Sequence, residues 1–436
     1  MNFLIRKSFF VVAGVILGLV SFVVINKDSL PERTIEISGP TIDLKNIAVS
    51  EYLNLSEKIK EGTELLENSP VLGIEEYVTE NVCFITGKTY RGLRKEISFA
   101  ILDKDTGVVF EKRCWFSKED IKEAEIFGGS LEKISDFLGL GNKKNEGDII
   151  NEELNLVINW WNGHNSDIAI KSLNPKDKEG RYIIVANKYP MLNDYLAYPQ
   201  DRTGKKYSDI IYVPYSGALH TQELIDEGRN FLNESVDTAY RELGEEGVQS
   251  VAYPGKLVID TVSPVFVKNI FLTEQTDPSL IFLAQDGGRK LAERVLVRLG
   301  TNKEKAFRYT YSSVGALGLG QIMPATYSNI RNFYPRAELI KDKNIGRVDI
   351  INGIKATILV FDDHFATVLK KLGDNKSGAS SLSKKLPAEI EEMRAAIYNG
   401  GPGKINAQTA AISSAIEETV SFVAKFKMIR SLGLFN

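Results

Sequence analysis

The stretch that decides the fold runs from residue 312 to residue 327 and reads SSVGALGLGQIMPATY. Three glycines, at positions 315, 318 and 320, interrupt its apolar run. Glycines this closely spaced indicate tight turns, or backbone that another group must approach closely. The stretch therefore predicts a tightly turned loop that another group approaches closely.

The composition and net charge of the chain limit the kinds of partner that it can bind. The chain has 436 residues, which is enough for two or three domains. Its hydrophobic and charged fractions, 43% and 25%, are typical of a globular protein. The formal net charge is −3, so we expect no large basic surface and no nucleic acid partner. A neutral sugar polymer is compatible with this charge.

The N-terminus predicts a membrane anchor. An apolar run from Phe9 to Ile25 follows the basic pair Arg6-Lys7. As a helix this run spans roughly 26 Å, close to the thickness of a hydrocarbon core, and the basic pair favours a cytoplasmic N-terminus. Because no small-x-small cleavage pattern follows Ile25, we favour an uncleaved anchor over a cleaved signal peptide. The prediction is a single-pass protein of the cytoplasmic membrane, with its C-terminal bulk exported to the periplasm or the exterior.

The pattern beyond the anchor indicates an α+β multidomain protein. Apolar residues alternate with a period near two over 76–118, which predicts a small antiparallel sheet. An amphipathic helix is expected over 221–243 with Thr221 as its N-cap, and 373–385 is expected to be a flexible insert. The expected divisions are a cytoplasmic tip and transmembrane anchor (1–27), a tether (28–45), a mixed α/β accessory region (46–215), a helical connector (216–258) and a mainly α domain (259–436).

Several patterns resemble ligand sites but lack a necessary part. Gly87-Lys88-Thr89 has no glycine five residues earlier, as a phosphate-binding loop requires. The segment 103–107 starts like a calcium loop, but its glycine comes one residue early, which favours a hairpin turn. The three histidines have no metal-ligand spacing, and Trp160-Trp161 is more typical of a partly buried aromatic pair than of a sugar platform. We therefore expect no metal and no cofactor.

The two cysteines, Cys83 and Cys114, flank strand-like runs in the predicted sheet. A disulfide between them is permitted in an exported domain. Two buried free thiols are an equally good interpretation, because sequence does not establish the geometry that a disulfide needs.

Glu274 is the strongest candidate for a catalytic acid. The pair Ser263-Pro264 predicts a helix start, apolar residues continue to Leu272, and Asp277-Pro278 predicts its end. Glu274 then lies in the last turn, in apolar surroundings and near the negative end of the helix dipole. Both effects disfavour the carboxylate and raise its pKa, as a general acid requires. Glu304 is the alternative acid, but it lies in a solvated cluster of charged residues.

Four segments of the chain, the glycine stretch and three that follow it, resemble the motifs of one enzyme family in the same order. The glycine stretch resembles the S-x-x-G-A-x-G-L-M-Q-x-M-P-x-T signature of soluble-type lytic transglycosylases, with Gly320 in place of a methionine. Residues 349–363 resemble the family's helix behind the cleft, residues 395–403 its A-Y-N-x-G turn, and residues 418–423 its terminal E-T-x-x-Y-V helix. Glu274 begins a sequence similar to the family's E-S-x-x-P helix end. About thirty additional residues then separate it from the glycine stretch, and 290–299 within them read as a helix.

The resemblance implies a lysozyme-like fold over about 260–430 and a specific chemistry. In this family one glutamate protonates the leaving oxygen of a glycosidic bond and then removes a proton from the sugar's own C6 hydroxyl. The product carries a 1,6-anhydro ring and no water is consumed. The resemblance assigns the glutamate's role to Glu274 and the orientation of its carboxyl to Tyr398. It implies substrate contacts by Ser312, Gly318, Leu319, Gln321, Met323 and Asn399.

The sequence thus predicts a membrane-anchored lytic transglycosylase that cleaves the MurNAc–GlcNAc β-1,4 bond of peptidoglycan strands. Two alternatives remain: a hydrolytic goose-type lysozyme on the same fold, and a non-catalytic peptidoglycan-binding scaffold of an envelope machine. The role of residues 45–245 also stays open. They could recognise stem peptides, dock a cell-envelope protein through 46–215, or only hold the catalytic domain in place.

Overall fold

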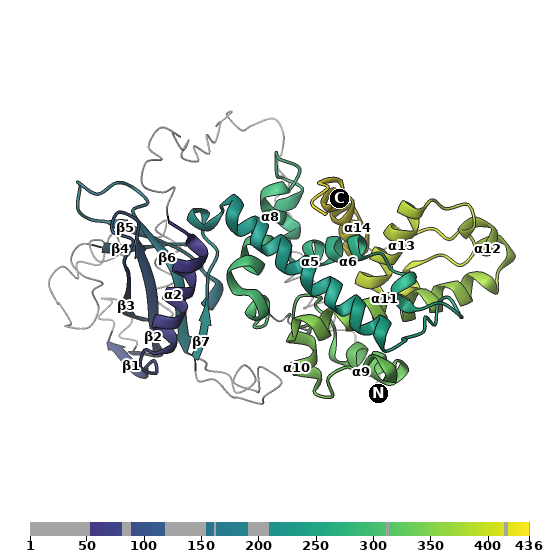
Figure 1. The fold of residues 1–436 in the computed structure, drawn as a ribbon, viewed down its shortest axis with the longest axis horizontal. Coiled ribbons are helices and arrows are strands. Elements are labelled where there is room, and N and C mark those ends of the chain that lie inside the picture. The colour runs from purple at the N-terminus through teal and green to yellow at the C-terminus, as the bar shows by residue number, and fades with distance from the viewer. Residues whose placement is uncertain are drawn as a thin grey trace, which may run out of the picture. The chain divides into compact units, whose positions relative to one another are not determined.

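The computed structural model describes residues 53–80, 89–117, 154–160, 163–190, 209–310, 312, 314–413 and 417–435. Strands predominate up to residue 212 and helices follow (Figure 1). The strands are β1 (Ile74–Glu80), β2 (Thr89–Asp103), β3 (Val109–Phe116), β4 (Leu154–Trp160), β5 (Asp167–Ser172), β6 (Tyr182–Pro190) and β7 (Asp209–Tyr212). The helices are α2 (Leu55–Glu67), α5 (Gln222–Glu245), α6 (Pro264–Gln275), α7 (Pro278–Ile281), α8 (Arg289–Asn302), α9 (Pro324–Phe333), α10 (Lys343–Val348), α11 (Ile350–Gly373), α12 (Lys376–Leu382), α13 (Pro387–Gly400) and α14 (Glu417–Ser431).

The predicted antiparallel sheet is present. Its strand order is β1-β2-β6-β7, and β3 pairs with the second half of β2. All described pairings within this sheet are antiparallel. The segment 103–107 forms the turn between β2 and β3, where the Asp103 carbonyl accepts from the Gly107 amide and Gly107 has a φ of 71°. Glycine suits this left-handed position, so the hairpin interpretation is confirmed.

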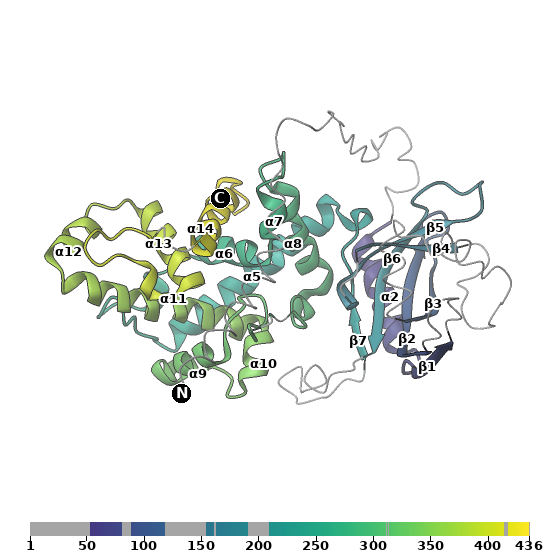
Figure 2. The same ribbon diagram turned by 180° about the vertical axis from the view of Figure 1, so that it is seen from behind.

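The two faces of the sheet are covered by different layers. Successive residues of β2 point to opposite faces, as the pleat requires. Ile97, Phe99 and Ile101 pack with the separate β4–β5 ladder, whereas Ala100 and Leu102 belong to the core shared with α2. Figure 2 shows the ladder and the helix beside this sheet.

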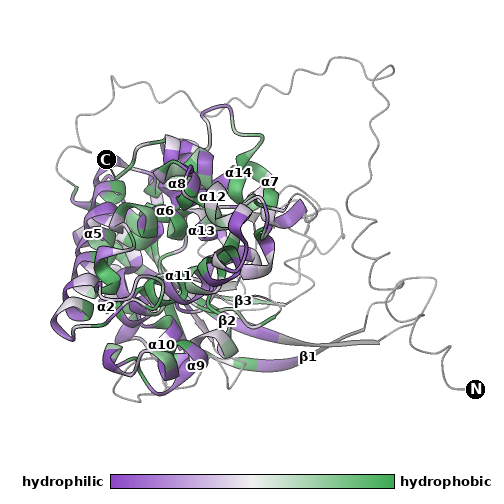
Figure 3. Cartoon of the chain, turned by 90° about the vertical axis from the view of Figure 1, so that its right-hand side faces the viewer, coloured by the Kyte–Doolittle hydropathy of each residue, from purple (hydrophilic) through white to green (hydrophobic). Residues whose placement is uncertain are grey.

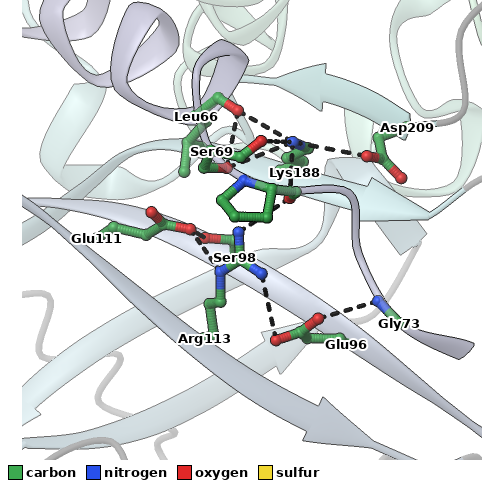
Figure 4. A network of polar contacts seen from close by, with 10 residues as sticks. Leu66, Ser69, Gly73, Glu96, Ser98, Glu111, Arg113, Lys188 and Asp209 are labelled. Carbon is green, nitrogen blue, oxygen red and sulfur yellow. Dashed lines mark hydrogen bonds and ion pairs between the residues drawn. The ribbon is translucent and has the colours of Figure 1, made fainter.

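A buried polar network ties α2 to the sheet (Figure 4). The ammonium group of Lys188 donates to the carbonyl oxygens of Leu66, Ser69 and Pro70, at 2.9–3.2 Å. It also forms an ion pair with Asp209 at 3.5 Å, and both side chains are buried. Because the carbonyl groups at the end of a helix have no partner within it, Lys188 caps α2 and joins it to β6 and β7.

The helical part is built from the amphipathic segments that the sequence predicts. Helix α5 starts after Thr221, whose side chain accepts from the Leu224 amide. Helix α6 starts after Ser263, whose side chain accepts from the Phe266 amide. Apolar residues of α5, α6, α8, α11 and α14 share one hydrophobic core. In Figure 3 the longer helices alternate hydrophobic and hydrophilic segments, as helices packed on a core do.

The membrane anchor requires a correction. Among the ranges given above, no helix is both long and apolar enough to span a bilayer. The two 24-residue helices, α5 and α11, both carry charged residues within them, for example Lys355 and Asp362 in α11. The run Phe9–Ile25 lies outside the described residues. The transmembrane part of the predicted fold class, the signal-anchor interpretation and the predicted single-pass membrane location are therefore not supported.

The flexible insert predicted over 373–385 is also wrong, because helix α12 occupies most of it. Asn375 caps this helix by accepting from the amides of Ser377 and Gly378. Gly378 is buried, and a Cβ there would overlap the carbonyl oxygen of Ala407. Gly378, one of the small residues that suggested a loop, is needed for this close packing.

Candidate active-site cleft

The glycine stretch forms one wall of a cleft of about 780 Å³. The end of α6, helix α8, the end of α13 and the start of α14 supply the other walls. Six of the residues predicted for the site line this cleft: Glu274, Ser312, Gln321, Met323, Tyr398 and Asn399. Segments separated by more than 120 residues in the sequence thus meet at one place.

The glycine stretch is a tight hairpin-like loop. Leu317 and Ile322 exchange backbone hydrogen bonds, and the Ser312 hydroxyl accepts from the Ala316 amide at 3.0 Å. Gly318 has a φ of 73°, and a Cβ there would overlap the backbone carbonyl of Arg347. Gly318 and Leu319 are not among the residues that line the cleft. Their carbonyl oxygens accept hydrogen bonds from the Gln275 side chain, and the substrate contacts expected of them stay a prediction.

Gly320 is required by close packing. A Cβ at this position would overlap the hydroxyl oxygen of Thr357 on α11. The methionine that the lytic transglycosylases carry here would therefore not fit this backbone. The departure from the family's signature has a local physical cause in the tight approach of α11.

Arg347 holds the glycine stretch from behind, a role that the sequence did not reveal. Its guanidinium donates to the carbonyl oxygens of Gly315 at 2.7 Å and of Ile322 at 3.0 Å. The residue is only 3% exposed, and it also donates to Lys343 and Asn344 of its own helix, α10. A buried charge with this many bonds fixes the shape of the loop.

Glu274 lies in the last turn of α6 and faces the cleft. Burial raises the pKa of its carboxyl from 4.5 to about 7; the charge of Lys425 opposes this rise and that of Glu418 adds to it. Among the described residues, none forms a hydrogen bond or a close ion pair with this carboxyl. A carboxyl of this kind is a proton donor near neutral pH.

Two neighbouring side chains position the end of α6. Gln275 donates its side-chain amide to the carbonyl oxygens of Gly318 at 3.2 Å and of Leu319 at 2.8 Å. Lys425 of α14 is buried and donates to the carbonyl oxygen of Thr276 at 3.0 Å. These bonds connect the acid-bearing helix to the glycine stretch and to α14. Sequence reasoning missed both residues, since neither has a local pattern.

Tyr398 is placed differently from its implied role. Its hydroxyl donates to the carbonyl oxygen of Gly320, not to the carboxyl of Glu274. Burial raises the pKa of this phenol, and the nearby charge of Glu274 raises it further. Its ring packs on Phe361 of α11, with ring centroids 4.7 Å apart. Tyr398 therefore fixes the glycine stretch beside Glu274.

The other predicted residues are partly held by their own neighbours. The side-chain amide of Gln321 donates to the Gly318 carbonyl at 2.8 Å, and its φ of 48° is unusual for a residue with a side chain. The side-chain oxygen of Asn399 accepts from the Thr419 hydroxyl at 3.1 Å. Met323 is 37% exposed at the cleft.

Glu304, the alternative acid, is exposed on a short 3-10 helix and does not line the cleft. The geometry thus favours Glu274 over Glu304. Cys114 is buried in β3, whereas its proposed partner Cys83 lies outside the described residues. The Gly87-Lys88 pattern and the Trp160 and Trp161 side chains also lie outside them. No cluster of histidine, cysteine and acidic side chains suited to a metal ion occurs in the described part of the chain.

Comparisons with known proteins give no information on the function of this chain. No protein-family model, no curated protein and no solved structure matches this chain.

Proposed function

We propose that the protein is a peptidoglycan lytic transglycosylase that cleaves the MurNAc–GlcNAc β-1,4 bond and leaves a 1,6-anhydro end. The observation that carries this proposal is Glu274, a carboxyl with a raised pKa that lines the same cleft as the glycine stretch. The cleft's volume of about 780 Å³ is within the usual range for ligand sites. Exposed apolar side chains at the cleft, among them Leu280, Val314 and Met323, suit the apolar faces of sugar rings.

The mechanism uses one carboxyl twice. Glu274 first donates its proton to the glycosidic oxygen, and the bond between that oxygen and C1 of the MurNAc sugar breaks. The C6 hydroxyl oxygen of the same sugar then bonds to C1, and its proton passes to the Glu274 carboxylate. The acid is regenerated, the atoms balance, and no water enters. The neutral form needed at the start is the form that burial of Glu274 favours.

Hydrolysis of the same glycosidic bond in the same cleft is the second candidate function, and the carboxylates in the cleft lining favour it. Two more carboxylates, Asp277 and Glu418, line the cleft. Asp277 caps α7 by accepting from the amides of Ser279 and Leu280, whereas Glu418 is exposed. A hydrolase needs a second carboxylate to activate water, and Glu418 is the better placed of the two for that role.

Digestion of purified peptidoglycan with mass analysis of the new ends distinguishes the two reactions. We expect 1,6-anhydro ends from the wild type, no activity from Glu274→Gln, and activity from Glu418→Gln. New reducing ends, together with inactivity of Glu418→Gln, would support the hydrolase. A wild type that binds glycan but cleaves nothing would support the non-catalytic scaffold.

The pH profile gives a second test. As Glu274 must start protonated, kcat/KM should fall as the pH rises through about 7. The exposed-acid variant Glu304→Gln should keep the wild-type profile. A wild-type profile with no loss of activity above pH 7 would remove Glu274 from the role of general acid.

A further inference from the structure

The accessory α/β region contributes a residue to the cleft. Asn165 lines the same cleft as Glu274, although it comes from the short 3-10 helix Gly163–Asn165 that precedes β5. Its neighbours in the cleft lining include Arg294 and Arg298 of α8, and Thr310. The lining near Asn165 thus contains two cationic side chains and a polar one, with the carboxylate of Asp277 also acting on Arg294, and it comes from two parts of the chain.

Asn165 is held in place by buried contacts. The ring of His164, the preceding residue, packs against Tyr212 with centroids 4.9 Å apart and against Tyr309 at 5.3 Å. The backbone carbonyl of His164 accepts from the Asn187 side chain at 2.9 Å. Because these partners belong to β6, β7 and the segment after α8, the position of Asn165 is fixed relative to the helical part.

A reciprocal pair of hydrogen bonds joins the two parts beside this point. The side chain of Asn302, at the end of α8, accepts from the Val213 amide at 2.8 Å and donates to the Val213 carbonyl at 3.0 Å. Asn302 is 7% exposed, so these bonds are shielded from water. The contact anchors α8, and therefore its two arginines, to the strand region that carries Asn165.

Two buried polar atoms at this end have no hydrogen-bond partner among the described residues. Asn165 is 3% exposed, and its side-chain oxygen accepts no hydrogen bond within the described structure. The Nε of Arg298 is likewise buried without an acceptor there. Buried polar atoms are normally paired, and an unpaired one costs free energy. One atom is an acceptor and the other a cationic donor, which fits a ligand that has both an N–H group and a carboxylate.

The two arginines are one helical turn apart and therefore share a face of α8. The guanidinium of Arg298 lies over the Phe307 ring, 4.2 Å from its centroid, and that of Arg294 lies over Tyr215 at 4.6 Å. Burial lowers the pKa of Arg294, and the charge of Arg298 lowers it further. Asp167 and Asp277 act on Arg294 in the opposite direction. Like charges held this close favour binding of an anion.

We propose that Asn165 and Arg298, with Arg294 beside them, form a subsite for the acidic peptide that is attached to peptidoglycan strands. This inference rests on the proposed function, since it names a part of the same substrate. Arg298 binds a peptide carboxylate, and the Asn165 side-chain oxygen accepts from a peptide amide. The accessory region thereby selects peptide-bearing strands.

The test compares two forms of one substrate, soluble glycan strands with their peptides intact and the same strands after enzymatic removal of the peptides. We expect the wild type to have the higher kcat/KM on peptide-bearing strands. Arg298→Gln and Asn165→Leu should lower that value by about tenfold or more, and change activity on peptide-free strands by less than about twofold. Arg298→Lys should be intermediate, and Arg241→Gln, a surface change on α5, is the matched control.

The outcomes separate the two proposals. Equal losses on both substrates, or no loss on either, would overturn the peptide subsite and leave the lytic activity intact. If the wild type cleaves neither substrate, the proposed function is wrong, and a binding measurement then tests the peptide subsite by itself. A fluorescent disaccharide-peptide should then bind Arg298→Gln about tenfold more weakly than the wild type, and a peptide-free disaccharide should bind both equally. Equal affinities for the disaccharide-peptide would reject the subsite.

Discussion

Replacing Glu274 by glutamine should stabilise the folded protein, and by an amount that depends on pH. The carboxyl has a pKa of about 7 in the folded protein, against an ordinary value of 4.5. Below pH 4.5 it is protonated in both the folded and the unfolded state. Between pH 4.5 and 7 the unfolded chain releases the proton while the folded protein keeps it, so the free energy of unfolding of the wild type falls. Above pH 7 the full cost, about 3 kcal/mol, applies to the wild type and not to Glu274→Gln.

The assay is urea denaturation of both proteins at a series of pH values from 4 to about 8.5. The difference between their free energies of unfolding should grow with pH and level off above about 7. Titrating groups that do not interact with Glu274 cancel in this difference, among them His164, whose burial lowers its pKa to about 3. Lys425 does not cancel, because the charge of Glu274 raises the pKa of its ammonium group. Glu304→Gln is the matched control, because its exposed side chain is already hydrated. A difference that stays constant over this range would refute the interpretation of Glu274 as a carboxyl that burial keeps protonated.

Three further changes test the structure around the cleft and the sheet. Gly320→Ala should lower the free energy of unfolding by about 1–3 kcal/mol, because the added Cβ meets the Thr357 hydroxyl; a urea midpoint equal to that of the wild type would contradict the packing. Lys188→Met should cost about 3 kcal/mol in the same measurement, since it leaves the buried Asp209 carboxylate without its cation. Arg347→Met should speed amide hydrogen exchange in the glycine stretch, and unchanged protection would show that the guanidinium does not hold the loop.

The elements that the sequence predicts well have local causes. Thr221 and Ser263 cap their helices as expected, and the apolar periodicity of α5 corresponds to its buried face. The hairpin at 103–107 follows from a glycine at a left-handed position. In each case the residues that determine the structure are within a few positions of it, so one sequence is sufficient.

The contacts that the sequence did not predict have a different physical origin. Arg347 contacts Gly315 across 32 positions, and Lys425 contacts Thr276 across 149. Tyr398 donates to Gly320, 78 positions away, although a nearby carboxyl was the expected acceptor. Such contacts depend on how whole elements pack, and nothing in the local pattern indicates them. Helix α12 shows the reverse error, because its small residues suggested a loop while tertiary packing requires one of them, Gly378.

One helix accounts for two features of the chain. The first is the long spacing between Glu274 and Ser312, which is the largest departure from the lytic transglycosylase pattern. The second is the contact of the accessory region with the cleft. The additional segment contains helix α8. This helix carries Arg294 and Arg298 into the cleft, and its end holds Val213 of the strand region through Asn302. A shorter connection would leave the strand region without this anchor and Asn165 without its cationic neighbours. The segment that separates the acid from the glycine stretch is thus the one that brings the accessory region to the cleft.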